Sequence, residues 1–331
     1  MKVIEGFSAC GREEMIEEMN HYGKGRSPFL FIIDFDLKNL HCIPLSRIDS
    51  GAVLYSINGL TNACPYEHRT GITLVKHPIP YKTYLKSFHK IIKQLGEGNT
   101  YLLNLTFPTK IETNAPLKEI FFISEAKYKL WFKDSFVVFS PETFIKISGS
   151  AVSAFPMKGT IDAAVKNAEV KLLEDDKEYA EHVTIVDLIR NDLNRVAKNV
   201  SVKRFRYVEK IKAGQRGLLQ VSSEIAGELD ASYNERIGDI LFSMLPAGSV
   251  TGAPKKKTIE IIKEVENYNR GYYTGIFGYF DGRNLDSAVM IRFIENMNGE
   301  YLFKSGGGIT IYSDPRKEYK ELIDKVYVPV I

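Results

Sequence analysis

Two pairs of glutamates are spaced so that each pair could hold a metal ion. Glu178 and Glu181 are three residues apart in a segment of helical character, and Glu318 and Glu321 have the same spacing in another. This spacing puts both carboxylates of a pair on one face of a helix. Two such faces turned toward each other would offer four oxygen donors of the kind that Mg²⁺ prefers. Taken singly, each glutamate is better explained as a solvated surface residue, because glutamate is common on helices.

A lysine in the sequence AFPMKGTID (residues 154–162) is the candidate nucleophile. Lys158 follows a segment rich in apolar and β-branched residues, so it is expected where a strand gives way to a turn. A lysine in such a turn is commonly a solvated charge. One set against apolar walls can instead lose its proton and become a nucleophile. The remainder of the chain has to decide between these two interpretations.

Three further features could bind an anion. The segment GSVTGAPK (248–255) lacks the Gly-Lys-Ser/Thr of a nucleotide phosphate loop, but it is a glycine-rich turn that leads into a helix start. The segment SGGGI (305–309) would let a ligand approach the backbone closely, although such a run is also a common loop. Arg292 lies within the apolar strand-like sequence AVMIRFI, where an arginine needs a partner such as a carboxylate.

The elements that must position these residues do not alternate regularly between strand and helix. Antiparallel sheets backed by helices are therefore expected. Residues 1–80 look like short strands and turns, and a hairpin is expected around residues 148–150. Helical spacing predicts helices over 81–100, 177–200, 252–269 and 314–328, and strands are predicted over 28–36, 51–59, 100–107, 272–280, 286–295 and 300–313.

Composition excludes several classes of protein. The 331 residues are 44% hydrophobic and 26% charged, with a net charge of +3, which indicates no broad basic face for nucleic acid. Three widely spaced cysteines favour neither a disulfide framework nor a zinc site. No stretch has the length of a signal peptide core or a membrane span. A cytoplasmic protein of one or two domains is expected.

Seven segments, taken in order, resemble the signatures of the chorismate-utilising enzymes. This family includes anthranilate synthase component I, aminodeoxychorismate synthase component I, isochorismate synthases and salicylate synthases. The resemblance covers roughly residues 95–325, and the ordered set is far more specific than any single motif. The segments are SPETF, PMKGT, EHVTIVDLIRNDLNRV, GSVTGAPKKKTIEII, YTGIFGYF, DSAVMIRF and GGGITIYSDPRKEYKE.

The resemblance implies an α+β fold with two large antiparallel β-sheets packed face to face and helices on the outside. Residues 1–90 would be a short N-terminal segment contributing strands to the same unit, and residues 91–331 the chorismate-binding catalytic core. It also implies a Mg²⁺ shell made by the four glutamates and completed by the ring carboxylate of chorismate. Tyr273 and Arg292 would hold the enolpyruvyl carboxylate. Thr251, Gly306 and Gly308 would hold substrate oxygens through hydroxyl and backbone N–H groups.

Within the family, PMKGT resembles the Pro-Ile-Lys-Gly-Thr of aminodeoxychorismate synthases, whereas anthranilate synthases typically have alanine in place of the lysine. The resemblance implies that Lys158 attacks C2 of chorismate and expels the C4 hydroxyl, and that ammonia then attacks C4 and expels Lys158. Two displacements replace one difficult substitution. Glu142 of SPETF matches the general acid that protonates the departing hydroxyl, and burial should raise its pKa. The product would be 4-amino-4-deoxychorismate, a precursor of 4-aminobenzoate and folate.

Two positions depart from the family pattern. Isochorismate and salicylate synthases resemble one another in having a water-activating lysine where this chain has Leu102, and most amination enzymes have glutamine there. Leu219 stands where the family usually has a histidine, which in anthranilate synthase is linked to pyruvate elimination. Leu102 cannot act as a base, which disfavours attack by water, and Leu219 cannot move a proton, which favours a product that keeps its enolpyruvyl group. Anthranilate synthase component I is the first alternative and isochorismate synthase the second; a non-catalytic binding or scaffold subunit is the third.

The source of ammonia is expected to be another protein. The chain has no cysteine in a glycine-flanked elbow with a downstream histidine, so glutamine-derived ammonia would come from a separate glutamine amidotransferase subunit. A separate lyase would release pyruvate. Nothing resembles the Leu-Leu-Glu-Ser signature of the tryptophan site in larger relatives, so inhibition by tryptophan is not expected.

Overall fold

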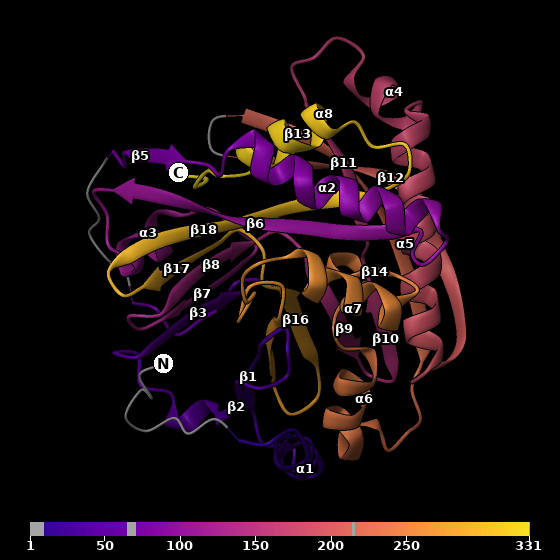
Figure 1. Cartoon of the computed structure of the whole chain (residues 1–331). Coiled ribbons are helices and arrows are strands. Elements are labelled where there is room, and N and C mark those ends of the chain that lie inside the picture. Colours follow the sequence, from indigo (N-terminus) through magenta and orange to yellow (C-terminus); the bar gives the residue numbers. More distant parts are fainter. Residues whose placement is uncertain (1–9, 65–70, 214–215, 331) are drawn as a thin grey trace.

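Two large antiparallel sheets form the centre of the molecule, and helices cover their outer faces (Figure 1). The computed structural model describes residues 10–64, 71–213 and 216–330. Its α-helices are α1 Arg12–Lys24, α2 Tyr81–Gly96, α3 Leu117–Ile123, α4 Ala168–Leu173, α5 Asp176–Asn194, α6 Ile237–Met244, α7 Lys255–Val265 and α8 Pro315–Asp324. Short 3₁₀ helices occupy Leu45–Arg47, Tyr233–Arg236 and Gly248–Val250.

The first sheet, sheet A, has the strand order β11-β13-β10-β9-β16-β15-β1-β2, with β12 also paired to β13. Its strands are β1 Phe29–Ile33, β2 Leu40–Pro44, β9 Thr143–Ser148, β10 Ala151–Ala154, β11 Met157–Asp162, β12 Lys198–Ala213, β13 Arg216–Glu228, β15 Ile276–Phe280 and β16 Leu285–Val289.

The second sheet, sheet B, has the order β14-β6-β18-β17-β8-β7-β3-β4, with β5 also paired to β6. Its strands are β3 Val53–Ile57, β4 Leu60–Thr61, β5 Leu74–His77, β6 Leu102–Thr113, β7 Tyr128–Phe132, β8 Phe136–Ser140, β14 Gly252–Ala253, β17 Phe293–Met297 and β18 Glu300–Ile309.

Strand β1 shows why the sheets pack face to face. All five of its side chains are buried, and they alternate between two cores. Leu30 and Ile32 join a cluster that contains residues of both sheets, whereas Phe29, Phe31 and Ile33 join a cluster with α1, α5 and α6. Because successive side chains of a strand point to opposite faces, an uninterrupted apolar run predicts a strand covered on both sides.

Helices cover the outer face of sheet B as well. Apolar residues of α2, α7 and α8 pack on β6 and β18, and α3 packs on β7 and β8 (Figure 1). This α+β arrangement of two antiparallel sheets with outer helices confirms the expected fold class.

Several expected elements differ in extent. Helix α1 lies within residues 1–80, where the sequence predicts only short strands and turns. Its buried side includes Met15 and Met19. The helix expected over 177–200 ends at Asn194, since β12 begins at Lys198, and the helix expected over 252–269 begins at Lys255 and ends at Val265. The hairpin around residues 148–150 is present as β9 and β10, with Gly149 at a φ of 57°.

The strand expected over 286–295 is in fact two strands in different sheets. β16 ends at Val289 in sheet A and β17 begins at Phe293 in sheet B. Arg292 lies between them with a φ of 53°, a left-handed conformation that a residue inside a strand does not adopt. The apolar character continues across the junction because both sheets bury it, which is why the sequence alone suggests one strand.

Candidate active site

Two of the expected site residues lie where the chain crosses from one sheet to the other. Glu142 joins β8 to β9, and Arg292 joins β17 to β16. Each crossing is hydrogen-bonded to the strand that leads into the other. The Phe139 N–H of β8 donates to the Arg292 carbonyl at 3.1 Å, and the Val289 N–H of β16 donates to the Glu142 carbonyl at 3.1 Å. The sandwich therefore places the candidate acid and the candidate carboxylate-binding arginine side by side, although 150 residues separate them in sequence.

Lys158 lies in strand β11, and not at the end of a strand as expected from the sequence. It is opposite Val221 of β13, and a bulge follows at Gly159, which has a φ of 74°. The Lys158 Nζ atom lies 3.7 Å from Oε2 of Glu181, and the lysine side chain is 20% exposed. Bulges re-aim side chains, and this one holds the amine next to Glu181, the second residue of the acidic pair on α5.

The glycine run of β18 provides room for these groups. A Cβ atom at Gly308 would lie 3.1 Å from Cδ1 of Leu102, 3.2 Å from Nζ of Lys158 and 3.7 Å from Oε2 of Glu181. Leu102 is buried, so the space above Gly308 is bordered by an apolar side chain as well as by the lysine amine. The lack of a side chain at Gly308 leaves this space open.

The neighbouring glycines have different surroundings. A Cβ atom at Gly307 would lie 3.5 Å from Oε1 of Glu321 and 3.8 Å from Oε2 of Glu318, so this glycine borders the second acidic pair. A Cβ atom at Gly306 would lie 2.5 Å from the Leu105 carbonyl oxygen. Gly306 is therefore needed for close packing of β18 on β6, whatever it does for a ligand.

Helix caps bring each glutamate pair to the start of its helix. The Asp175 carboxylate accepts the N–H of Glu178 at 2.9 Å before α5, and Asp314 caps α8, which has Pro315 in its first turn. A carboxylate near a helix N-terminus is favoured by the dipole. Both pairs therefore begin in the first turn of their helices.

The four glutamates are chemically suited to a divalent cation. Glu181 and Glu318 are 7% and 4% exposed. Burial raises the pKa of Glu178, and the negative charges of Glu181 and Glu321 raise it further, whereas Lys158 lowers it. A divalent cation bound between these carboxylates would relieve their mutual repulsion. Within the described ranges, however, no three acidic, histidine or cysteine side chains converge closely enough to form a metal centre.

Glu142 has the environment of a general acid. Burial raises its pKa; a hydrogen bond from the Ser249 hydroxyl to its Oε1 lowers the pKa, as do the charges of Lys158 and Lys325. The carboxyl group can therefore hold a proton above the pH range usual for glutamate. Ser249 belongs to the turn 248–250, so the acid is tied to the same loop that carries Thr251.

The expected substrate-binding side chains have contacts within the protein. The Thr251 hydroxyl donates within its own loop, to the Ala247 carbonyl at 2.9 Å. Tyr273 is 3% exposed, and burial raises its pKa; the charges that act on it include those of Arg292 and Glu142. Arg292 donates to the Lys325 carbonyl at 3.2 Å and lies over the Tyr327 ring at 4.9 Å. The crossover thus gathers Tyr273, Arg292 and Glu142 in one region.

One cation in this region was missed by the sequence analysis. The Lys325 Nζ atom lies 2.6 Å from Oε1 of Glu321 and donates to the Gly306 carbonyl at 2.8 Å. It follows Glu321 by four residues, a spacing that predicts an ion pair on one helix face. The spacing is therefore a usable signal, because both residues lie within the helix expected over 314–328.

Comparison with known proteins identifies the family. A family model described as chorismate binding enzyme matches residues 41–330. The chain belongs to this family. The matched range contains sheet B, most strands of sheet A, all four glutamates and Lys158.

Individual relatives in this family differ in their stated activities. The chain is 48% identical over 318 residues to an uncharacterized PabA-like protein of Haemophilus influenzae, covering 96% of this chain and 97% of the relative. It is 34% identical to anthranilate synthase component 1 of Archaeoglobus fulgidus, over 73% of this chain and 61% of the relative. It is 31% identical to aminodeoxychorismate synthase component 1 of Bacillus subtilis, over 76% of this chain and 55% of the relative.

The fold is shared with a solved chorismate enzyme. The menaquinone-specific isochorismate synthase from Escherichia coli superimposes with a TM-score of 0.71 at 16% identity, covering 95% of this chain and 80% of that one. At this identity the likeness concerns the fold alone.

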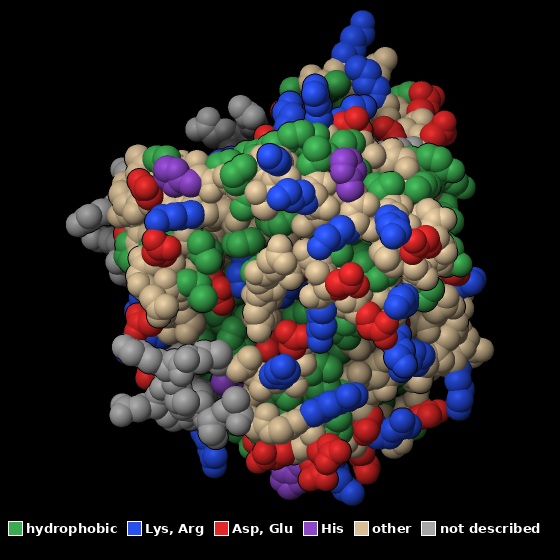
Figure 2. Space-filling view, in the orientation of Figure 1, with side chains coloured by type: hydrophobic (Ala, Val, Ile, Leu, Met, Phe, Trp, Pro, Cys, Tyr) green, Lys and Arg blue, Asp and Glu red, His purple; other side chains and the backbone are tan. Residues whose placement is uncertain are grey.

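The surface agrees with the composition. On the face shown in Figure 2, Lys and Arg side chains are intermixed with Asp and Glu, without a continuous patch of one sign. In the part of the chain that the structure describes, each helix is too short or too polar to cross a membrane.

Proposed function

We propose that this chorismate-binding enzyme is an aminodeoxychorismate synthase component I, which replaces the C4 hydroxyl of chorismate by ammonia. The observation that supports this most is the position of Lys158. Its Nζ atom lies 3.7 Å from Glu181 and borders the space above Gly308, which the apolar side chain of Leu102 also borders. An amine in this setting has both an apolar wall and an acidic helix face that can orient a substrate.

In the proposed reaction, the uncharged Lys158 amine forms a bond to C2 of chorismate as the ring double bond shifts. The C4–O bond breaks, and Glu142 donates its proton so that the hydroxyl leaves as water. Ammonia then bonds to C4, the double bond shifts back, and the C2–N bond to Lys158 breaks. The Glu142 carboxylate accepts the proton that ammonia releases, which restores the acid for the next turnover.

The substrate carboxylates would be held at opposite ends of this site. Mg²⁺, bound by the glutamates of α5 and α8, would supply positive charge to the ring carboxylate. Tyr273 and Arg292 would hold the enolpyruvyl carboxylate, for which arginine offers a forked pair of donors. Thr251, Gly306 and Gly308 would contribute a hydroxyl and backbone N–H groups to the remaining oxygens.

Anthranilate synthase component I is the second candidate, because the relative from Archaeoglobus fulgidus is 34% identical. Lys158 and Leu219 favour amination at C4 without pyruvate loss, since an apolar residue at position 219 cannot move a proton. Leu102 likewise disfavours activation of water for an isochorismate product.

The test is identification of the product by mass. The protein is incubated with chorismate, Mg²⁺ and ammonium, with and without an added lyase. We expect a product with the mass of 4-amino-4-deoxychorismate, which becomes 4-aminobenzoate only when lyase is added. Fluorescent anthranilate in the absence of lyase would refute the proposal in favour of the second candidate. A product with chorismate's mass that separates from chorismate by chromatography would indicate isochorismate.

A partner subunit completes the proposal. Ammonia at physiological pH would be supplied by a separate glutamine amidotransferase, and ammonium at high pH would replace that subunit in the assay. Addition of a matching amidotransferase and glutamine should support turnover at neutral pH without ammonium.

A further inference from the structure

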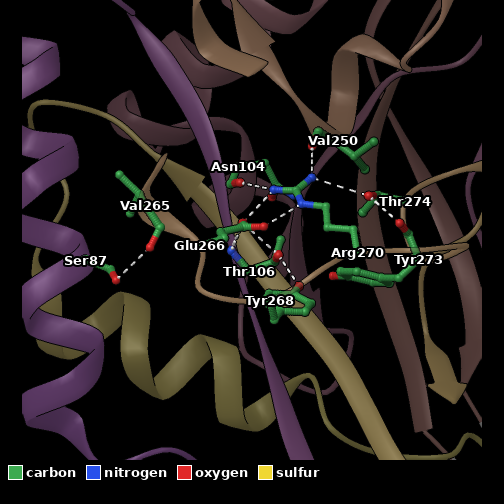
Figure 3. A network of polar contacts seen from close by, with 10 residues as sticks. All are labelled: Ser87, Asn104, Thr106, Val250, Val265, Glu266, Tyr268, Arg270, Tyr273 and Thr274. Carbon is green, nitrogen blue, oxygen red and sulfur yellow. Dashed lines mark hydrogen bonds and ion pairs between the residues drawn. The ribbon is translucent and has the colours of Figure 1, made fainter. Parts of the chain in front are cut away.

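A buried ion pair lies at the centre of a network of polar contacts (Figure 3). Arg270 and Glu266 are four residues apart after α7, and each side chain is only 2% exposed. Two parallel hydrogen bonds join them: Arg270 Nε to Glu266 Oε2 at 2.8 Å and Arg270 Nη2 to Glu266 Oε1 at 2.7 Å. Buried pairs of this kind add little net stability, so their position in the fold needs another explanation.

The carboxylate side of the pair holds strand β6. Glu266 Oε1 accepts the Thr106 N–H at 2.9 Å and the Thr106 hydroxyl at 2.8 Å. The Tyr268 hydroxyl lies 2.5 Å from the same Thr106 oxygen. Thr106 is the ladder partner of Gly306 in β18. Glu266 therefore fixes the position of β6 at Thr106, the residue that pairs with Gly306 of β18.

The guanidinium side of the pair contacts three segments, one of which is β6 again, as Figure 3 shows. Arg270 Nη2 donates to the carbonyl of Asn104 at 2.7 Å, and Asn104 is the ladder partner of Gly308. Arg270 Nη1 donates to the carbonyl of Val250 at 2.9 Å, directly before Thr251. The Asn104 N–H in turn donates to the Thr251 carbonyl at 2.8 Å.

The third segment is strained. Arg270 Nη1 also donates to the Thr274 hydroxyl at 3.3 Å, and that hydroxyl donates to the Tyr273 carbonyl at 2.6 Å. Thr274 is 1% exposed and has a φ of 64°, which is unfavourable for a β-branched residue. Such a conformation persists only where surrounding contacts enforce it, and it occurs mainly at functional sites.

We propose that the Glu266–Arg270 pair is a positioning element for chorismate, since it holds the backbone next to Thr251, Tyr273, Gly306 and Gly308 in one arrangement. The inference rests on the proposed binding roles of these four residues. Each of them is one chain position or one ladder partner away from an atom that the pair contacts. A planar guanidinium can reach all three segments at once because its donors form a rigid fork, which an ammonium group cannot reproduce.

The test compares chorismate binding with stability. Arg270→Lys keeps the charge but loses the fork, and Asn20→Ala is the control, because Asn20 makes polar contacts from α1 to α6, on Asp239 and Gly238. Chorismate affinity is measured by calorimetry in the presence of Mg²⁺, and the melting temperature is measured without ligand. We expect Arg270→Lys to weaken chorismate binding by about tenfold or more, as lost positioning hydrogen bonds do, whereas Asn20→Ala lowers the melting temperature without weakening binding.

Thr274 variants keep the test valid if Arg270→Lys does not fold. Thr274→Val removes the hydroxyl between the guanidinium and Tyr273 without changing the shape of the side chain, and Thr274→Ser retains it. We expect KM for chorismate to rise several-fold in Thr274→Val with kcat and KM for ammonium nearly unchanged, and Thr274→Ser to bind like the wild type.

Two results would overturn the inference: unchanged chorismate affinity in a folded Arg270→Lys protein, or Thr274→Val and Thr274→Ser that bind equally well. Neither depends on which product the enzyme releases. A wrong product mass would refute the proposed function and leave the binding comparison valid.

Discussion

Nζ of Lys158 lies 3.7 Å from Oε2 of Glu181, so the candidate nucleophile contacts the candidate metal-binding helix. These residues come from strand β11 and helix α5. The contact links the two halves of the proposed chemistry, because a cation bound by the glutamates would orient chorismate while the amine attacks it. The following predictions test this arrangement.

Lys158→Ala should abolish amination while leaving the fold intact, since the side chain is partly exposed. We expect ammonium-dependent product formation to fall by at least about 100-fold, or roughly 2.7 kcal/mol of activation free energy. The matched control is Lys146→Ala, because Lys146 is 28% exposed and forms a similar pair with Asp286 at 3.0 Å in the same sheet. A Lys158→Ala protein with full activity would exclude the covalent step and favour direct attack by ammonia.

Glu142→Gln should reduce the rate by about 10²–10⁴-fold, the usual contribution of a general acid. Burial raises the pKa of Glu142, so the wild-type enzyme should lose activity as pH rises through that pKa and the acid deprotonates. Ser249→Ala removes a hydrogen bond that stabilises the charged form, and should move this loss to higher pH. Identical pH profiles of kcat in Ser249→Ala and the wild type would argue against Glu142 as the acid.

Glu181→Gln and Glu318→Gln should each raise the Mg²⁺ concentration needed for half-maximal activity. We expect an increase of about 10–100-fold, and complete loss of activity of the wild type with a chelator. Glu174→Gln is a suitable control, because Glu174 is an exposed residue that precedes α5. An unchanged Mg²⁺ requirement in both variants would remove these carboxylates from the metal site.

Gly308→Ala should impair catalysis more than stability. The added Cβ would lie 3.2 Å from the Lys158 amine and 3.1 Å from Leu102, so the amine must shift. Misplacement of a reacting group by about 1 Å can cost about 10²-fold in rate. Gly96→Ala is the control, since a Cβ there meets nothing within 4 Å. The measurements are the steady-state rates and melting temperatures of both variants. Equal rates in Gly308→Ala and Gly96→Ala would show that the Lys158 amine does not need the space above Gly308.

His182 should make stability depend on pH. Burial lowers its pKa from 6.5 to about 4, and the charges of Arg206 and Lys158 contribute; its Nε2 lies 2.7 Å from the Ser223 hydroxyl. Because the unfolded chain binds the proton more readily, stability should fall as pH drops from about 6.5 to about 4, by about 3 kcal/mol for this residue. Urea unfolding at pH 7 and pH 4.5 measures the effect, which His182→Gln should reduce. An undiminished pH effect in the variant would assign the dependence to other groups.

Local sequence determines much of the site. Helical spacing predicts helices over 177–200 and 314–328 with a glutamate pair on each, and the structure has them as α5 and α8. The apolar run in residues 28–36 predicts a strand, which the structure has as β1. These features depend on neighbours within a few positions, so a single sequence is enough to predict them.

Other features depend on pairing between distant segments. The sequence alone does not predict that the strand ends before Arg292, nor that Arg292 lies beside Glu142. The residues before Arg292 are buried in sheet A and those after it in sheet B, so the apolar pattern is continuous. Lys158 appeared to begin a turn, and only the pairing of β11 with β13 keeps it in a strand. The contacts of Arg270 with Val250 and Asn104 come from segments 20 and 166 residues away. Local periodicity carries no information about such partners, so the tertiary structure alone decides where these charges lie.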